Sequence, residues 1–171
     1  MKQFVLIFLI SIGASQFAVS QDSTATDYFN KGDYYYRNFD HQIAVEYFNK
    51  AINLEPGHVN ALLQRGFCKN ILKDFSGAVA DFSEVIKISP DHRWAYVSRG
   101  SARNKTGDYN LAIEDFNKAL EIDPTDQEAY NNRGFSKKLS GDKDGACEDW
   151  NKSRKLGNEE AKIIIKNNYC K

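Results

Sequence analysis

Residues 93–126 read RWAYVSRGSARNKTGDYNLAIEDFNKALEIDPTD, and this stretch decides the fold of the 171-residue chain. Small and apolar side chains recur three or four positions apart in both of its halves, which is the spacing of one face of an α-helix. Gly107 and Asp108 interrupt the pattern in the middle, and Pro124 ends it. We therefore predict two helices joined by a tight turn, with the Asp108 carboxylate accepting hydrogen bonds from the first turn of the second helix.

The same pattern occurs four times, with a period of 34 residues and without a gap. The residues that follow the period are Gly32, Gly66, Gly100 and Gly134; Ala44, Ala78, Ala112 and Ala146; Phe48, Phe82, Phe116 and Trp150; and Pro56, Pro90 and Pro124. The capping aspartates would be Asp40, Asp74, Asp108 and Asp142. The units are 25–58, 59–92, 93–126 and 127–160. Because small residues let the paired helices approach closely and aromatic rings fill the remaining space, we predict an all-α fold.

These units resemble tetratricopeptide repeats, a family of helix–turn–helix units of the same length. The shared pattern places a large residue, a glycine, an alanine, an aromatic residue and a proline at fixed positions in each unit. The fourth unit departs from it with Asn158 in place of proline, as a terminal unit can. The resemblance implies a right-handed α-solenoid, in which the first helices of the units form a concave wall. It also implies a non-catalytic module that binds a peptide or helix of a partner protein in that groove.

The lining of the groove can be carried over from the family by position within each unit. The resulting set contains more apolar side chains than a solvated helix face needs, interleaved with polar groups that could orient a ligand. Its members are Phe29, Tyr36, Arg37, Leu63, Phe67, Trp94, Val97, Lys105, Asn131, Asn132 and Phe135, with Ile71 and Leu139 beside them. Some of them could instead contact a neighbouring unit and belong to the core.

The N-terminal residues have the three parts of a secretory signal peptide. Lys2 is followed by the apolar run 4–12 and by the small-residue exit Ala18-Val19-Ser20. The run is short for a transmembrane helix, so we expect a signal peptide over 1–20, a leader over 21–24 and no membrane span after cleavage. The expected location is the periplasm, or the outside of the cell, of a bacterium. An uncleaved anchor or a buried first helix is the alternative.

The C-terminal residues 161–171 are predicted to form a capping helix, which an open-ended array of repeats needs. Its apolar face would consist of Ala161, Ile164, Ile165 and Tyr169. If this helix folds back antiparallel, Cys147 and Cys170 could meet in a disulfide; two free thiols are the alternative. Cys68 falls on the face that packs against its partner helix, which predicts a buried, inert thiol.

Composition and motifs exclude several classes of protein. The chain has 23 basic and 23 acidic side chains, which argues against a dedicated nucleic-acid binder. It contains none of the common catalytic or cofactor motifs, and His41, His58 and His92 lack the spacing of metal ligands. Acidic pairs such as Asp81/Glu84 and Glu114/Asp115 would lie on a solvated outer face or pair with lysines one turn away on the same helix. We predict no enzyme activity, cofactor or metal; the alternative function is a fixed structural subunit of a bacterial envelope or secretion assembly.

Overall fold

The computed structural model describes residues 23–167 and 170. The predicted signal peptide, residues 21 and 22 of the predicted leader, and residues 168, Tyr169 and 171 of the predicted cap lie outside them. In the described part the chain forms helices and no strands. The helices are α1 (Ala25–Arg37), α2 (His41–Leu54), α3 (Val59–Ile71), α4 (Phe75–Ile88), α5 (Arg93–Thr106), α6 (Tyr109–Ile122), α7 (Gln127–Ser140), α8 (Lys143–Lys155) and α9 (Glu159–Lys166). The predicted all-α solenoid is confirmed.

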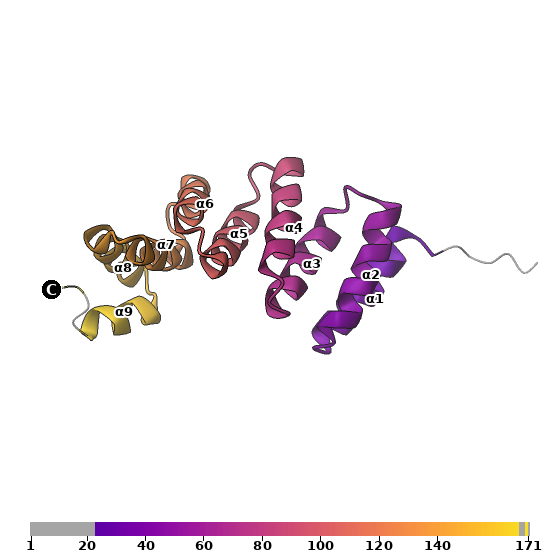
Figure 1. Ribbon diagram of the computed structural model, residues 1–171, viewed down its shortest axis with the longest axis horizontal. Coiled ribbons are helices and arrows are strands. Elements are labelled where there is room, and N and C mark those ends of the chain that lie inside the picture. Colours follow the sequence, from indigo (N-terminus) through magenta and orange to yellow (C-terminus); the bar gives the residue numbers. More distant parts are fainter. Residues whose placement is uncertain (1–22, 168–169, 171) are drawn as a thin grey trace, which may run out of the picture.

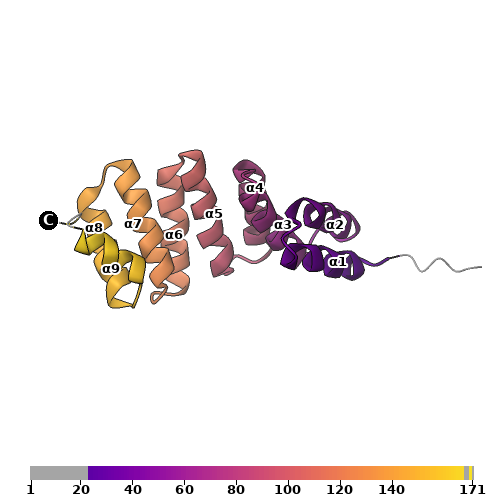
Figure 2. The same ribbon diagram turned by 90° about the horizontal axis from the view of Figure 1, so that it is seen from below.

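The helices stack in sequence order along one axis (Figures 1 and 2). Each helix contacts mainly the helix before it and the helix after it. The buried apolar residues accordingly form a series of clusters shared by neighbouring helices. The array therefore has the nearest-neighbour energetics of a repeat protein and no single central core.

The periodic glycines bring the two helices of each unit together. A Cβ atom added to Gly100 would lie 2.9 Å from Phe116 Cζ, and the other three glycines face the periodic aromatic ring of their own unit in the same way. All four of these rings are fully buried. The close approach that the sequence predicts is confirmed. It sets the position of each first helix relative to the second helix of its unit.

All four predicted aspartates are N-caps of second helices, but two of the four predicted side-chain hydrogen bonds are absent. Asp74 accepts a hydrogen bond from Gly77 N at 2.9 Å, and Asp142 makes the same bond to Gly145 N, but Asp40 and Asp108 cap without a side-chain bond. The Asp108 carboxylate instead accepts from the Thr106 hydroxyl at 2.6 Å. A glycine three positions later is not required for the capping bond, since Asp126 accepts from Ala129 N at 3.0 Å.

The turns between paired helices require a left-handed residue at the same place in every unit. The third and fourth units supply Gly107 and Gly141, whose φ angles are 90° and 98°. The first two units have Phe39 and Lys73 there, with φ angles of 64° and 66°. A side chain at a left-handed position is strained, because its Cβ atom crowds the following carbonyl oxygen.

Lys73→Gly is expected to raise the free energy of unfolding by about 0.5–1 kcal/mol, since relief of this strain outweighs the extra entropy of an unfolded glycine. Urea denaturation followed by circular dichroism measures the change. Gly107→Ala is the matched control and should change stability in the opposite direction. Equal stability of both variants and the wild type would contradict the assignment of strain.

Candidate partner-binding surface

The candidate groove lies on α1, α3, α5 and α7, and buried ion pairs fix the last three of these helices to the second helices of their units. In the third unit Asp115 accepts from Arg99 Nη2 at 2.7 Å and from Arg103 Nη1 at 2.8 Å. Asp81 and Asp149 repeat the arrangement in the second and fourth units. The expectation of a solvated outer face is therefore wrong for Asp81 and Asp115, which are buried. The signal that could have found these pairs is the period itself, since both partners recur every 34 residues.

The apolar candidates divide into exposed and half-buried side chains. Trp94 is 50% exposed and lies 4.1 Å from the Arg93 guanidinium carbon, measured to its ring centroid. Phe67 and Phe135 are half-buried, and their rings lie 5.4 Å from those of Phe82 and Trp150 respectively.

The other half-buried candidates belong to the first two units. The Phe29 ring lies 5.9 Å from that of Phe48, and Leu63 packs against two of the buried clusters. Tyr36 is half-buried beside His41. Half-buried candidates are thus anchored in the core and present only part of their surface to solvent.

Val97 and Asn131 do not line a groove, which corrects the prediction. Val97 is 3% exposed and belongs to the buried cluster around Phe116. Asn131 is 2% exposed, and its amide donates to Glu160 Oε2 at 2.6 Å. Both residues occupy the place in the first helix that faces the following helical unit, so stacking buries them. The position of a residue within its unit does not by itself show whether the side chain lines the groove or contacts a neighbouring unit.

The polar candidates lie at the edges of the surface. Arg37 is exposed and pairs with Asp33 at 2.8 Å, one turn earlier in α1. Lys105 is exposed, and Asn132 is half-buried. Ile71 and Leu139, at the places equivalent to Arg37 and Lys105, are 51% and 50% exposed. We define the first-helix surface as the exposed or half-buried apolar candidates Phe29, Tyr36, Leu63, Phe67, Ile71, Trp94, Phe135 and Leu139.

The C-terminal helix α9 covers the last unit. It begins at Glu159, with Asn158 as its N-cap, and its last residue is Lys166. Ala161, Ile164 and Ile165 pack on the cluster around Trp150. The structure joins Cys147 and Cys170 in a disulfide, with Cα atoms 5.5 Å apart. This bond ties the end of the chain to α8.

The remaining cysteine is buried, and two of the histidines cap helices. Burial raises the pKa of the Cys68 thiol to about 11, which keeps it protonated. His58 Nδ1 and His92 Nδ1 each accept a hydrogen bond from the first turn of a following helix, at 3.2 Å. Among residues 23–167 and 170 there is no cluster of three or more metal-ligating side chains, and no helix long and apolar enough to cross a membrane.

Comparisons with known proteins agree with the repeat pattern. The family model for the tetratricopeptide repeat matches residues 25–58, and a second model, described as TPR repeat, matches residues 100–141. No curated protein matches the chain in sequence. The chain is a tetratricopeptide repeat protein.

Several solved structures have the same fold. MamA from Desulfovibrio magneticus RS-1 is 25% identical with a TM-score of 0.74, over 77% of this chain and 75% of that chain. The first TPR of Spaghetti (RPAP3), bound to an HSP90 peptide, is 25% identical with a TM-score of 0.63, over 68% and 90%. The Arabidopsis OM64 TPR domain is 25% identical with a TM-score of 0.64, over 67% and 94%.

Proposed function

We propose that this protein is a non-catalytic interaction module that binds a peptide or helix of a partner protein on its first-helix surface. The observation that carries the proposal is the exposure of Trp94, Ile71 and Leu139 on the first helices of three successive units. Large exposed apolar side chains on a stable scaffold mark binding surfaces, and tryptophan is enriched among the residues that dominate binding energy. Phe67 on α3 and Phe135 on α7 are half-buried and add apolar side chains that the core holds in place.

The chemistry of this surface favours an apolar ligand segment over a carboxylate-terminated one. The similar RPAP3 domain is bound to an HSP90 peptide. In that use of the family, lysine and asparagine side chains grip the terminal carboxylate. The matching positions here include Phe29, Asp33, Trp94 and Ser98, which offer no cation. We infer that the partner contributes apolar anchors, with Asn132 and Lys105 orienting its polar groups.

We also propose that the protein acts after export from a bacterial cell. The signal-like sequence 1–20 is the main support. The disulfide between Cys147 and Cys170 is consistent with it, because disulfides persist in oxidising compartments. Fractionation of cells that express the full chain tests the location, and recovery of the protein only from the cytoplasm would reject it.

Trp94→Ala is expected to weaken partner binding about tenfold or more, since truncating a central aromatic anchor typically costs at least ~1.4–2 kcal/mol. Partners are first captured from a cell-envelope extract, and the affinity of the binding segment is then measured by calorimetry. The helical circular dichroism signal should remain at the wild-type value, because Trp94 is half exposed.

Leu111→Ala is the matched control, because Leu111 is 43% exposed but lies on the second helix α6. It should leave affinity unchanged. If Leu111→Ala weakens binding and Trp94→Ala does not, the partner uses the second-helix side. That result would favour the fixed-subunit alternative.

A further inference from the structure

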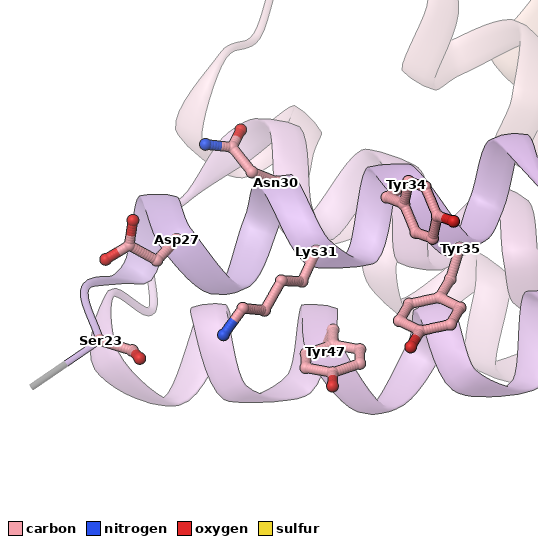
Figure 3. A pocket seen from close by; sticks show the side chains of 7 residues that line it. All are labelled: Ser23, Asp27, Asn30, Lys31, Tyr34, Tyr35 and Tyr47. Atoms are coloured by element: carbon pink, nitrogen blue, oxygen red, sulfur yellow. The ribbon is translucent and has the colours of Figure 1, made fainter.

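One face of α1 carries four polar or aromatic side chains that are spaced three and four residues apart. They are Asp27, Asn30, Lys31 and Tyr34, and this spacing places them on successive turns of the same side of the helix. Figure 3 shows these side chains along α1. All four are exposed, and Tyr34 is 63% exposed. We call these four residues the α1 outer face.

The equivalent faces of α3, α5 and α7 are buried against the preceding unit. In the 34-residue period, Asp27 and Tyr34 correspond to small side chains that are all fully buried: Ala61, Ala95 and Ala129, and Cys68, Ala102 and Ser136. Ala61 and Cys68, for example, pack in the cluster around Phe48 of α2. The first unit has a charged and a bulky residue at these two places. The α1 outer face is therefore unsuited to the close apolar contact that joins internal units.

The exposed ring of Tyr34 is held in place by its neighbours. It meets the ring of Tyr35 edge to face, with centroids 5.4 Å apart and an angle of 83° between the planes. The Tyr35 ring is itself stacked on that of Tyr47 at 5.3 Å. A ring held in this way loses little conformational freedom on binding, and tyrosine is enriched at protein interfaces. Tyr34 is therefore suited to contact another protein surface.

The α1 outer face carries one negative and one positive charge, one helical turn apart. Asp27 Oδ2 accepts from the Thr24 backbone N–H and hydroxyl, both at 2.9 Å. These two bonds, and to a smaller extent the charge of Lys31, lower the pKa of Asp27. A carboxylate has a second oxygen, so Oδ1 can accept from a further group. In the described part of the chain Lys31 forms no ion pair.

These charges make the α1 outer face complementary to itself. A face with one acid and one base has no net charge, so it does not select a ligand of either sign. When two copies of it meet in opposite directions, however, each acid faces a base. A two-fold interface requires this kind of self-complementarity.

We propose that two copies of this chain associate through the α1 outer face, with the two helices antiparallel about a two-fold axis near Asn30. Asp27 of each copy then approaches Lys31 of the other. The two Asn30 amides, which can both donate and accept, lie near the axis, and the Tyr34 rings cover the ends of the contact. Helices of 13 residues are about 20 Å long, so the interface is small and the dimer weak. The contact does not use the first-helix surface, so this proposal and the proposed function can fail independently.

Sedimentation equilibrium at low ionic strength measures the dimer dissociation constant, using protein purified from cells that express the full chain. Lys31→Glu makes the α1 outer face wholly acidic, and Asp27→Lys makes it wholly basic. Each variant alone should dimerise at least about tenfold more weakly than the wild type, because like charges then face each other. An equimolar mixture of the two variants should associate within about threefold of the wild type, since every acid again faces a base.

Two further variants separate this contact from general effects of charge and folding. Tyr34→Ser installs the side chain that the fourth unit has at this place, and it should weaken the dimer about threefold or more without a change in charge. Lys73→Glu reverses an exposed lysine of the second unit and should change the dissociation constant less than about twofold. Circular dichroism reports whether each variant is folded.

Three results would overturn the proposal. The first is a wild-type protein that stays monomeric at every concentration. The second is a dimer that Lys31→Glu weakens no more than Lys73→Glu does. The third is a mixture of folded Lys31→Glu and Asp27→Lys chains that associates no better than either variant alone.

Discussion

Asp115→Ala is expected to lower the free energy of unfolding by about 3–5 kcal/mol, because removing one member of a buried ion pair leaves the other charges without compensation. Asp115 holds two guanidinium groups at once, and the side chains of Arg99 and Arg103 are only 15% and 16% exposed. Arg99 Nη1 also donates to Ser83 Oγ in the preceding unit at 3.0 Å. Loss of Asp115 should therefore loosen both the third unit and its contact with the second.

Urea denaturation at fixed pH measures the effect, with Glu114→Ala as the matched control. Glu114 is the adjacent residue of α6 and is exposed, so its removal should cost less than about 0.5 kcal/mol. Asp115→Asn retains acceptor capacity without the charge and should fall between the two. Similar stabilities for Asp115→Ala and Glu114→Ala would contradict this expectation. They would mean that water solvates the guanidinium groups of Arg99 and Arg103 once the carboxylate is removed.

The second large effect is expected from the C-terminal disulfide. Replacing Cys147 and Cys170 together by serine should cost about 3 kcal/mol, since the bond closes a loop with a sequence separation of 23 residues and restricts the unfolded chain. The loss should be concentrated in α9. A helix of eight residues is not stable alone, and α9 depends on its contact with the last unit.

Hydrogen exchange followed by mass spectrometry measures this loss by segment. Amides of α9 should exchange much faster in the double serine variant, while amides of α3 and α4 stay protected. Treatment of the wild-type protein with dithiothreitol should reproduce the result, and the same treatment should leave the double variant unchanged. Unaltered protection of α9 in both cases would show that Ala161, Ile164 and Ile165 hold the helix without the bond.

The period of 34 residues was sufficient to predict the helices and their pairing. Gly100 and Phe116 recur in every unit or are replaced by equivalents, so their contact could be inferred from one unit and extended to all. The cap at Asp108 could not be predicted in the same way. The Asp108 carboxylate accepts from the Thr106 hydroxyl instead of the following turn, and no other unit has a threonine at that place.

The candidate surface was predicted less well, for a physical reason. Val97 and Trp94 both lie on α5, and both are apolar, but stacking of the next unit buries only Val97. Which of the two side chains is buried depends on the rotation between consecutive units. The sequence of a single unit does not encode that rotation. Asp81 was misplaced because a charged residue on a second helix is normally solvated, and its two cationic partners come from the other helix of the unit.

The covered C-terminal end and the polar N-terminal end of the described array both differ from the contacts between internal units. Identical chains that associate head to tail form rings or open filaments, and such growth requires two complementary ends. Here α9 occupies the site of a following unit, and Asp27 stands where internal units bury an alanine. A second copy of this chain would therefore meet a covering helix at one end and a carboxylate at the other, neither of which matches the apolar contact between internal units.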